Sequence, residues 1–164
     1  MLTLHKAFLP LLLLSACAHP LTSVVVVRHA EKQLDQGDDP SLTEKGAARA
    51  QILAAMLART QPAAIYATEW KRTKETMQPL ADLLKVPIET VDAKATDVLA
   101  KKILAEHEGQ TVVVAGHSNT VNKLIAALGG PVFADLEDSD YDNLFLLTIC
   151  GSQAKLQTLR LEVK

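Results

Sequence analysis

Four basic side chains could together hold a phosphoryl group. They are Arg28, His29, Arg72 and His117, and each comes shortly after an apolar run that is typical of a buried strand. Taken singly, each has a structural explanation, since a histidine after a strand is commonly a half-buried loop residue and an arginine in a first helical turn is commonly solvated. The carboxyl ends of parallel strands meet at one edge of a sheet, where ligands collect. We therefore expect the four side chains to form one cationic cluster.

These residue types fit the chemistry of a phosphate ester. Arg28 and Arg72 have planar guanidinium groups that match phosphate oxygens in a bidentate way. His29 could attack phosphorus and form a phosphohistidine that water then hydrolyses, while His117 could donate to an equatorial oxygen. Because flanking guanidinium charges disfavour a protonated imidazole, we expect His29 to be neutral near neutral pH.

Four ordered blocks of sequence resemble the histidine phosphatase superfamily, which has the phosphoglycerate mutase-like fold. The blocks are Arg28–Glu31, Leu42–Gly46, Tyr66–Thr76 and Gly116–Ser118, and the resemblance spans residues 24–149. It implies that His29 is the nucleophile and that Arg28, Arg72 and His117 complete the phosphate pocket. The short length resembles the small members of the family, such as phosphohistidine phosphatases.

The chain departs from the family pattern at the proton donor. Many members place a glutamate in an insertion after the third strand, but Val91–Lys94 leaves almost no insertion, and others have an acid where this chain has Ser118. Asp92 and Glu31 are candidate substitutes, although each also fits a surface or turn position. An alkoxide without a donor departs slowly. We therefore expect easier leaving groups, such as phosphohistidine or a phosphoanhydride, and no mutase activity.

The same residues bear on two alternatives, a metal site and a protein that binds anions without catalysis. Zinc or iron bound by His29 and His117 would lack nearby cysteines or paired carboxylates, so we expect no metal and no other cofactor. The missing proton donor leaves open a non-catalytic lipoprotein that binds phosphate or another anion. The presence of His29 together with both arginines favours the enzyme.

The amino terminus resembles a lipoprotein-type signal peptide. Lys6 precedes the apolar run Ala7–Leu14, which is far shorter than the roughly 20 residues needed to span a bilayer core. The run ends at Leu14–Cys17, which resembles the bacterial lipobox, whose cysteine is lipidated and begins the mature chain. A generic secretory peptide, or a buried helix with an incidental cysteine, is the alternative.

These features predict a chain of three parts. Residues 1–16 form the signal peptide, residues 17–22 a short tether and residues 23–164 the histidine phosphatase domain. Lipid on Cys17 would place the domain on the periplasmic face of a bacterial membrane. Outer-membrane lipoproteins of Gram-negative bacteria lack aspartate directly after the lipidated cysteine. This chain also lacks it after Cys17, so we expect the outer membrane.

Composition narrows the choice of partners. The 164 residues, 48% hydrophobic and 22% charged, suit one globular domain. The aromatic share of 4% and the net charge of -2 provide neither a stacking face nor a general attraction for nucleic acid. The expected partners are a phosphorylated small molecule or phosphoprotein as substrate, the membrane through Cys17, and no nucleic acid.

Strands and helices alternate along the chain between residues 24 and 128. We expect strands at 23–28, 63–67, 86–91 and 111–115, helices after the N-caps Thr43 and Thr68 and over 94–107 and 119–128, and a hairpin of 144–149 and 155–161 turned by Gly151-Ser152. This order predicts an α/β fold with three α/β/α layers and a mostly parallel central sheet.

Overall fold

The computed structural model describes residues 19–163. Cys17 and the predicted signal peptide lie outside the described residues. No helix within residues 19–163 is long and apolar enough to cross a membrane.

Six strands and four α-helices form the domain. In chain order they are β1 (Thr22–Arg28), α1 (Glu44–Leu57), β2 (Ala64–Thr68), α2 (Lys71–Leu84), β3 (Ile88–Val91), α3 (Thr96–Glu106), β4 (Thr111–Gly116), α4 (Val121–Ala127), β5 (Asn143–Cys150) and β6 (Gln153–Arg160), with a 3-10 turn at Ala58–Thr60. The elements expected from the sequence are therefore present.

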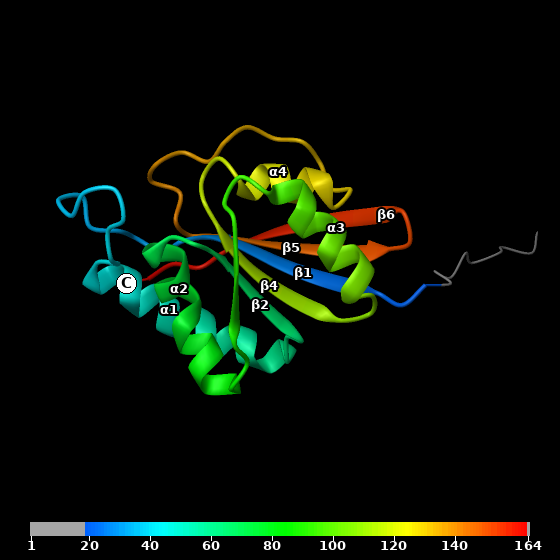
Figure 1. The fold of residues 1–164 in the computed structure, drawn as a ribbon, viewed down its shortest axis with the longest axis horizontal. Helices are drawn as coiled ribbons and strands as arrows, with labels where there is room; N and C mark the ends of the chain where they lie inside the picture. Colours follow the sequence, from blue (N-terminus) through cyan, green and yellow to red (C-terminus); the bar gives the residue numbers. More distant parts are fainter. Residues whose placement is uncertain (1–18, 164) are drawn as a thin grey trace, which may run out of the picture.

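The six strands make one sheet in the order β3-β2-β4-β1-β5-β6. The first four strands are mutually parallel, while β5 pairs antiparallel with both β1 and β6. Helices α1 and α2 cover one face and α3 and α4 the other (Figure 1). The predicted three-layer α/β/α fold with a mostly parallel sheet is confirmed.

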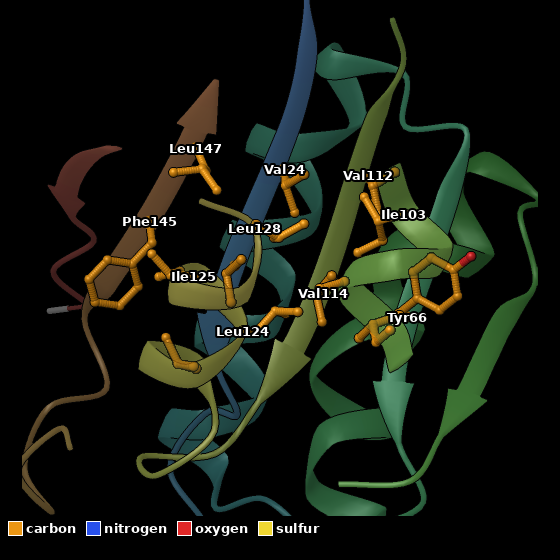
Figure 2. Close-up of a cluster of buried hydrophobic side chains, with 14 of the residues drawn as sticks. Val24, Tyr66, Ile103, Val112, Val114, Leu124, Ile125, Leu128, Phe145 and Leu147 are labelled. Carbon is orange, nitrogen blue, oxygen red and sulfur yellow. The ribbon is translucent and has the colours of Figure 1, made fainter. Parts of the chain in front are cut away.

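The first strand is buried on both faces. Val24, labelled in Figure 2, and Val26 pack towards α3 and α4, whereas Val25 and Val27 pack towards α1 and α2. All four are at most 2% exposed. Burial on both faces explains why this strand is a continuous β-branched run rather than an alternating one.

One predicted helix start is wrong. Thr43 is the N-cap of α1, with its side chain accepting from the Gly46 amide, as expected. Helix α2 instead begins at Lys71 after the N-cap Trp70, because Thr68 is the last residue of β2 and its hydroxyl is used by other side chains. The β5–β6 hairpin is confirmed.

Candidate active site

The parallel strands bring the four predicted basic residues to one edge of the sheet. Arg28 is the last residue of β1 and His29 follows it, His117 follows β4, and Arg72 lies in the first turn of α2. The rings of His29 and His117 have centroids 5.4 Å apart. The charges of both arginines act on His29, so the four side chains form the expected cluster.

Hydrogen bonds hold His29 with one ring nitrogen available. Its Nδ1 lies 2.8 Å from the carbonyl oxygen of Ala30, and since a carbonyl only accepts, Nδ1 carries the proton and Nε2 the lone pair. The backbone is fixed on both sides, because the His29 amide donates to the Gly116 carbonyl and the Ala30 amide to the Thr76 hydroxyl. Nε2 is thus the ring nitrogen whose lone pair could act as a nucleophile.

The imidazole of His29 is neutral at physiological pH. Burial is the largest cause that lowers its pKa, to about 3, with smaller contributions from the charges of His117, Arg28 and Arg72. From the sequence we expect the arginine charges to keep His29 neutral. In the structure His29 is only 3% exposed, and its desolvation is the larger cause of the lowered pKa. A neutral imidazole is the form required of a nucleophile.

His117 is oriented by the end of β2. Its Nε2 lies 2.9 Å from the hydroxyl of Thr68, which in turn lies 2.8 Å from the hydroxyl of Thr73 in α2. The pKa of His117 is lowered to about 4, mainly by burial and also by the charge of Arg72, while Glu69 opposes the shift. The sequence predicts a different role for Thr68, as a helix N-cap, and none for Thr73, because no sequence pattern marks a hydroxyl that binds a histidine far along the chain.

Arg28 is covered by the long loop between α4 and β5. Its Nη1 donates to the carbonyls of Glu137 at 2.7 Å and Asp138 at 3.1 Å, and its guanidinium lies 4.2 Å from the ring centroid of Tyr141. The ring of Tyr141 also lies 6.0 Å from that of His29. In Figure 1 this loop curves over the same end of the sheet as the loop between β1 and α1.

Arg72 has different neighbours. Its guanidinium lies 4.8 Å from the Trp70 ring centroid, and its Nη1 lies 3.9 Å from the Asp39 carboxylate. Within residues 19–163, the buried Nε atoms of Arg28 and Arg72 have no hydrogen-bond partner. An unpaired buried donor costs about 1–3 kcal/mol, and an anion accepting from both guanidinium groups would remove that cost.

The two carboxylates proposed as proton donors are engaged elsewhere. Glu31 accepts from Arg49 Nε at 2.9 Å and from Nη2 at 2.7 Å. Asp92 accepts from the Lys94 amide at 2.8 Å, inside the turn before α3. A carboxylate held ionised by a guanidinium has no proton to give, which argues against Glu31 as the donor.

Glu31 instead contributes to stability. Burial alone would raise its pKa, but the hydrogen bonds and charge of Arg49 prevail and lower the pKa below its usual 4.5. A lowered folded-state pKa adds stability above the unfolded value, and that stability is lost as the pH falls through the folded value. We expect Glu31→Gln to lower the free energy of unfolding by about 2 kcal/mol at neutral pH, measured by urea denaturation. A difference that does not shrink in acid would contradict this role.

The Leu42–Gly46 block reaches the same region. The Thr43 amide donates to the Glu31 carbonyl, and a Cβ at Gly46 would collide with that carbonyl oxygen. Glycine thus lets α1 approach the chain that leaves His29. Within residues 19–163, no group of three or more histidine, cysteine, aspartate and glutamate side chains could hold a metal ion.

The fold is shared with several solved phosphatase structures. A mycobacterial glucosyl-3-phosphoglycerate phosphatase superposes with a TM-score of 0.68 at 15% identity, covering 87% of this chain and 100% of that one. The protein histidine phosphatase SixA in complex with tungstate superposes with a TM-score of 0.68 at 18% identity, covering 84% and 96%. A candidate phosphohistidine phosphatase SixA from Agrobacterium tumefaciens has 23% identity and a TM-score of 0.59, covering 87% and 99%.

The sequence comparisons add one family. No curated protein matches the chain at a significant level. Residues 24–95 match the model of the histidine phosphatase superfamily, branch 1; this range includes three of the four basic residues, and His117 lies beyond it. The chain therefore resembles the histidine phosphatase superfamily over residues 24–95, and its fold is that of the compared phosphatases.

Proposed function

We propose that the chain is a phosphatase that hydrolyses a phosphoric ester or a phosphohistidine through a phosphohistidine intermediate on His29. The observation that supports this most directly is the state of His29: a neutral, buried imidazole with Nδ1 bound to the Ala30 carbonyl and Nε2 free to attack. Two arginines with unpaired buried Nε atoms lie beside it.

The reaction has two displacements. In the first, His29 Nε2 forms a bond to phosphorus as the bond to the leaving group breaks, and the leaving group takes a proton from solvent or already carries one. In the second, water attacks phosphorus, the phosphorus–nitrogen bond breaks, and neutral His29 returns with phosphate. Arg28 and Arg72 stabilise the charge on the equatorial oxygens in both steps. Since these guanidinium groups supply the positive charge, we propose that no metal or other cofactor is needed.

The substrate class follows from the leaving group. The compared phosphatases act, by their names, on protein phosphohistidine and on glucosyl-3-phosphoglycerate, so a phosphoprotein and a phosphorylated small molecule are both candidates. Glu31 and Asp92 have other partners, which favours phosphohistidine or a phosphoanhydride, whose leaving groups depend less on a donor.

Trapping the intermediate tests the proposal. The domain would be incubated with a labelled phosphodonor from a panel of phosphohistidine, nucleotide, sugar-phosphate and phospholipid substrates, and quenched in alkali. An acid-labile phosphoprotein together with phosphate release supports the enzyme. Anion binding without labelling or turnover across the panel would instead support the non-catalytic anion-binding lipoprotein, which the engagement of both candidate donors favours.

We further propose that the chain is exported and anchored through lipid on Cys17. The support is the lipobox-like Leu14–Cys17 that follows the short apolar run. Cys17→Ser is expected to abolish palmitate labelling and to release the protein from the membrane fraction on cell lysis, with Ser15→Ala as a matched control. Equal labelling of the variant, or a mass that shows Cys17 joined to Cys150 by a disulfide in the native protein, would refute the anchor.

A further inference from the structure

Two threonine hydroxyls determine which nitrogen of His117 carries a proton. The Thr73 hydroxyl lies 2.7 Å from the carbonyl oxygen of Trp70. Two oxygens at that distance repel unless a hydrogen lies between them, and the carbonyl has none to offer. The Thr73 hydroxyl also lies 3.1 Å from the Thr68 carbonyl oxygen, so its single proton is donated to main-chain carbonyls and not to the Thr68 hydroxyl.

The direction of the hydrogen bond between the Thr68 and Thr73 hydroxyls is then determined. Thr68 Oγ1 lies 2.8 Å from Thr73 Oγ1, so the hydrogen between them must belong to Thr68. Because Thr68 donates its own proton to Thr73, its Oγ1 can only accept from His117 Nε2, which lies 2.9 Å away. Nε2 of His117 therefore carries a hydrogen.

The other nitrogen of His117 is left as an acceptor. A neutral imidazole has one N–H, and burial favours the neutral form by lowering the pKa to about 4. Thr68 occupies Nε2, so Nδ1 is the ring nitrogen left to meet a ligand between His117 and the neighbouring His29 ring. A lone pair there would repel a phosphate oxygen.

We propose that His117 takes up one proton from solvent at Nδ1 when the site binds a dianionic phosphoryl group, and that Thr73 and Thr68 are positioning residues that impose this requirement. The proposal rests on the proposed function, because it assumes that the anion binds beside His117. The sequence predicts only that His117 donates to an equatorial oxygen. The hydroxyl chain adds that it can do so only as an imidazolium.

The proton taken up on anion binding can be assigned to His117 among the charged groups around it. The charged and titratable groups that act on it, from β1, the loop after β1, the β2–α2 connection and α2, are Arg28, His29, Lys32, Glu69 and Arg72. The pKa values of His29, about 3, and His117, about 4, both lie below 7 in the free site. Proton uptake near pH 7 is therefore assigned to His117 by its loss in a Thr73 variant, because the Thr73 hydroxyl reaches His117 through Thr68.

Sulfate is the probe, because it remains a dianion through the neutral range and brings no proton of its own. Isothermal titration in buffers of different ionisation heat is expected to show uptake of about one proton per bound sulfate near pH 7. Affinity is expected to fall about tenfold for each pH unit, since binding is linked to one proton.

Thr73→Val is the decisive variant. Valine has nearly the shape of threonine but leaves the Thr68 hydroxyl free to donate to His117 Nε2, which moves the imidazole proton to Nδ1. Proton uptake is then expected to fall towards zero and the affinity for sulfate to become nearly independent of pH. Thr73→Ser restores the hydroxyl and should restore both the uptake and the pH dependence. A merely structural role for Thr73 would weaken binding without flattening its pH profile.

The outcomes separate this inference from the proposed function. Sulfate binding by the native chain without proton uptake, or with uptake unchanged in Thr73→Val, would overturn the role of the hydroxyl chain and leave the phosphatase intact. Failure of the native chain to bind sulfate or to form a phosphoenzyme would contradict the phosphate site itself.

Discussion

Replacing His29 with asparagine is expected to reduce phosphate release by at least about 10³-fold, as loss of a nucleophile does in enzymes that form covalent intermediates. Asparagine can still donate to the Ala30 carbonyl that accepts from His29 Nδ1, but it has no nitrogen lone pair to attack phosphorus. The variant should therefore keep its fold and lose the labelled intermediate. Single-turnover phosphate release and alkaline gel analysis of the phosphoenzyme measure the two effects.

A second histidine provides the control for this variant. His19 is 61% exposed and pairs with Glu108, away from the four basic residues, so His19→Asn should label and turn over like the native chain. Circular dichroism would show whether His29→Asn is folded. A folded His29→Asn variant that still forms an acid-labile phosphoprotein would place the nucleophile elsewhere.

The parallel sheet and the phosphate cluster could be predicted because their signals lie in side-chain types. The continuous Val24–Val27 run requires burial on both faces, and the rule that ligands bind at the carboxyl ends of parallel strands then places Arg28, His29 and His117 at one edge. Arg72 could be added because it follows another buried strand.

The loops and the hydrogen-bond network could not be predicted in this way. Arg28 donates to the main-chain carbonyls of Glu137 and Asp138. Because every residue has a carbonyl, no pattern of side chains predicts such a contact. Thr68 has the type and position of a helix N-cap, yet tertiary packing assigns its hydroxyl to His117. Desolvation of His29 likewise depends on the whole fold rather than on its neighbours in sequence.

Removal of the Arg72 side chain is expected to weaken vanadate or phosphate binding by about 10²- to 10³-fold, the usual effect of deleting a donor to a transition-state oxyanion. Arg72 is the more informative of the two arginines. Arg28 also binds the carbonyls of the α4–β5 loop, so its loss would disturb that loop as well, whereas Arg72 lies against Trp70 at the start of α2. Equilibrium titration with vanadate measures the change.

Two further substitutions separate the guanidinium group from its charge. Arg72→Lys keeps the positive charge but loses the planar fork and the contact with Trp70, so it should recover only part of the affinity. Arg59→Ala removes an exposed arginine in the 3-10 turn after α1 and should leave binding unchanged. Full recovery by lysine would reduce the role of Arg72 to a point charge. Unchanged affinity in Arg72→Ala would mean that the phosphate lies elsewhere, because a guanidinium with a buried and unpaired Nε cannot bind the anion without contributing to its affinity.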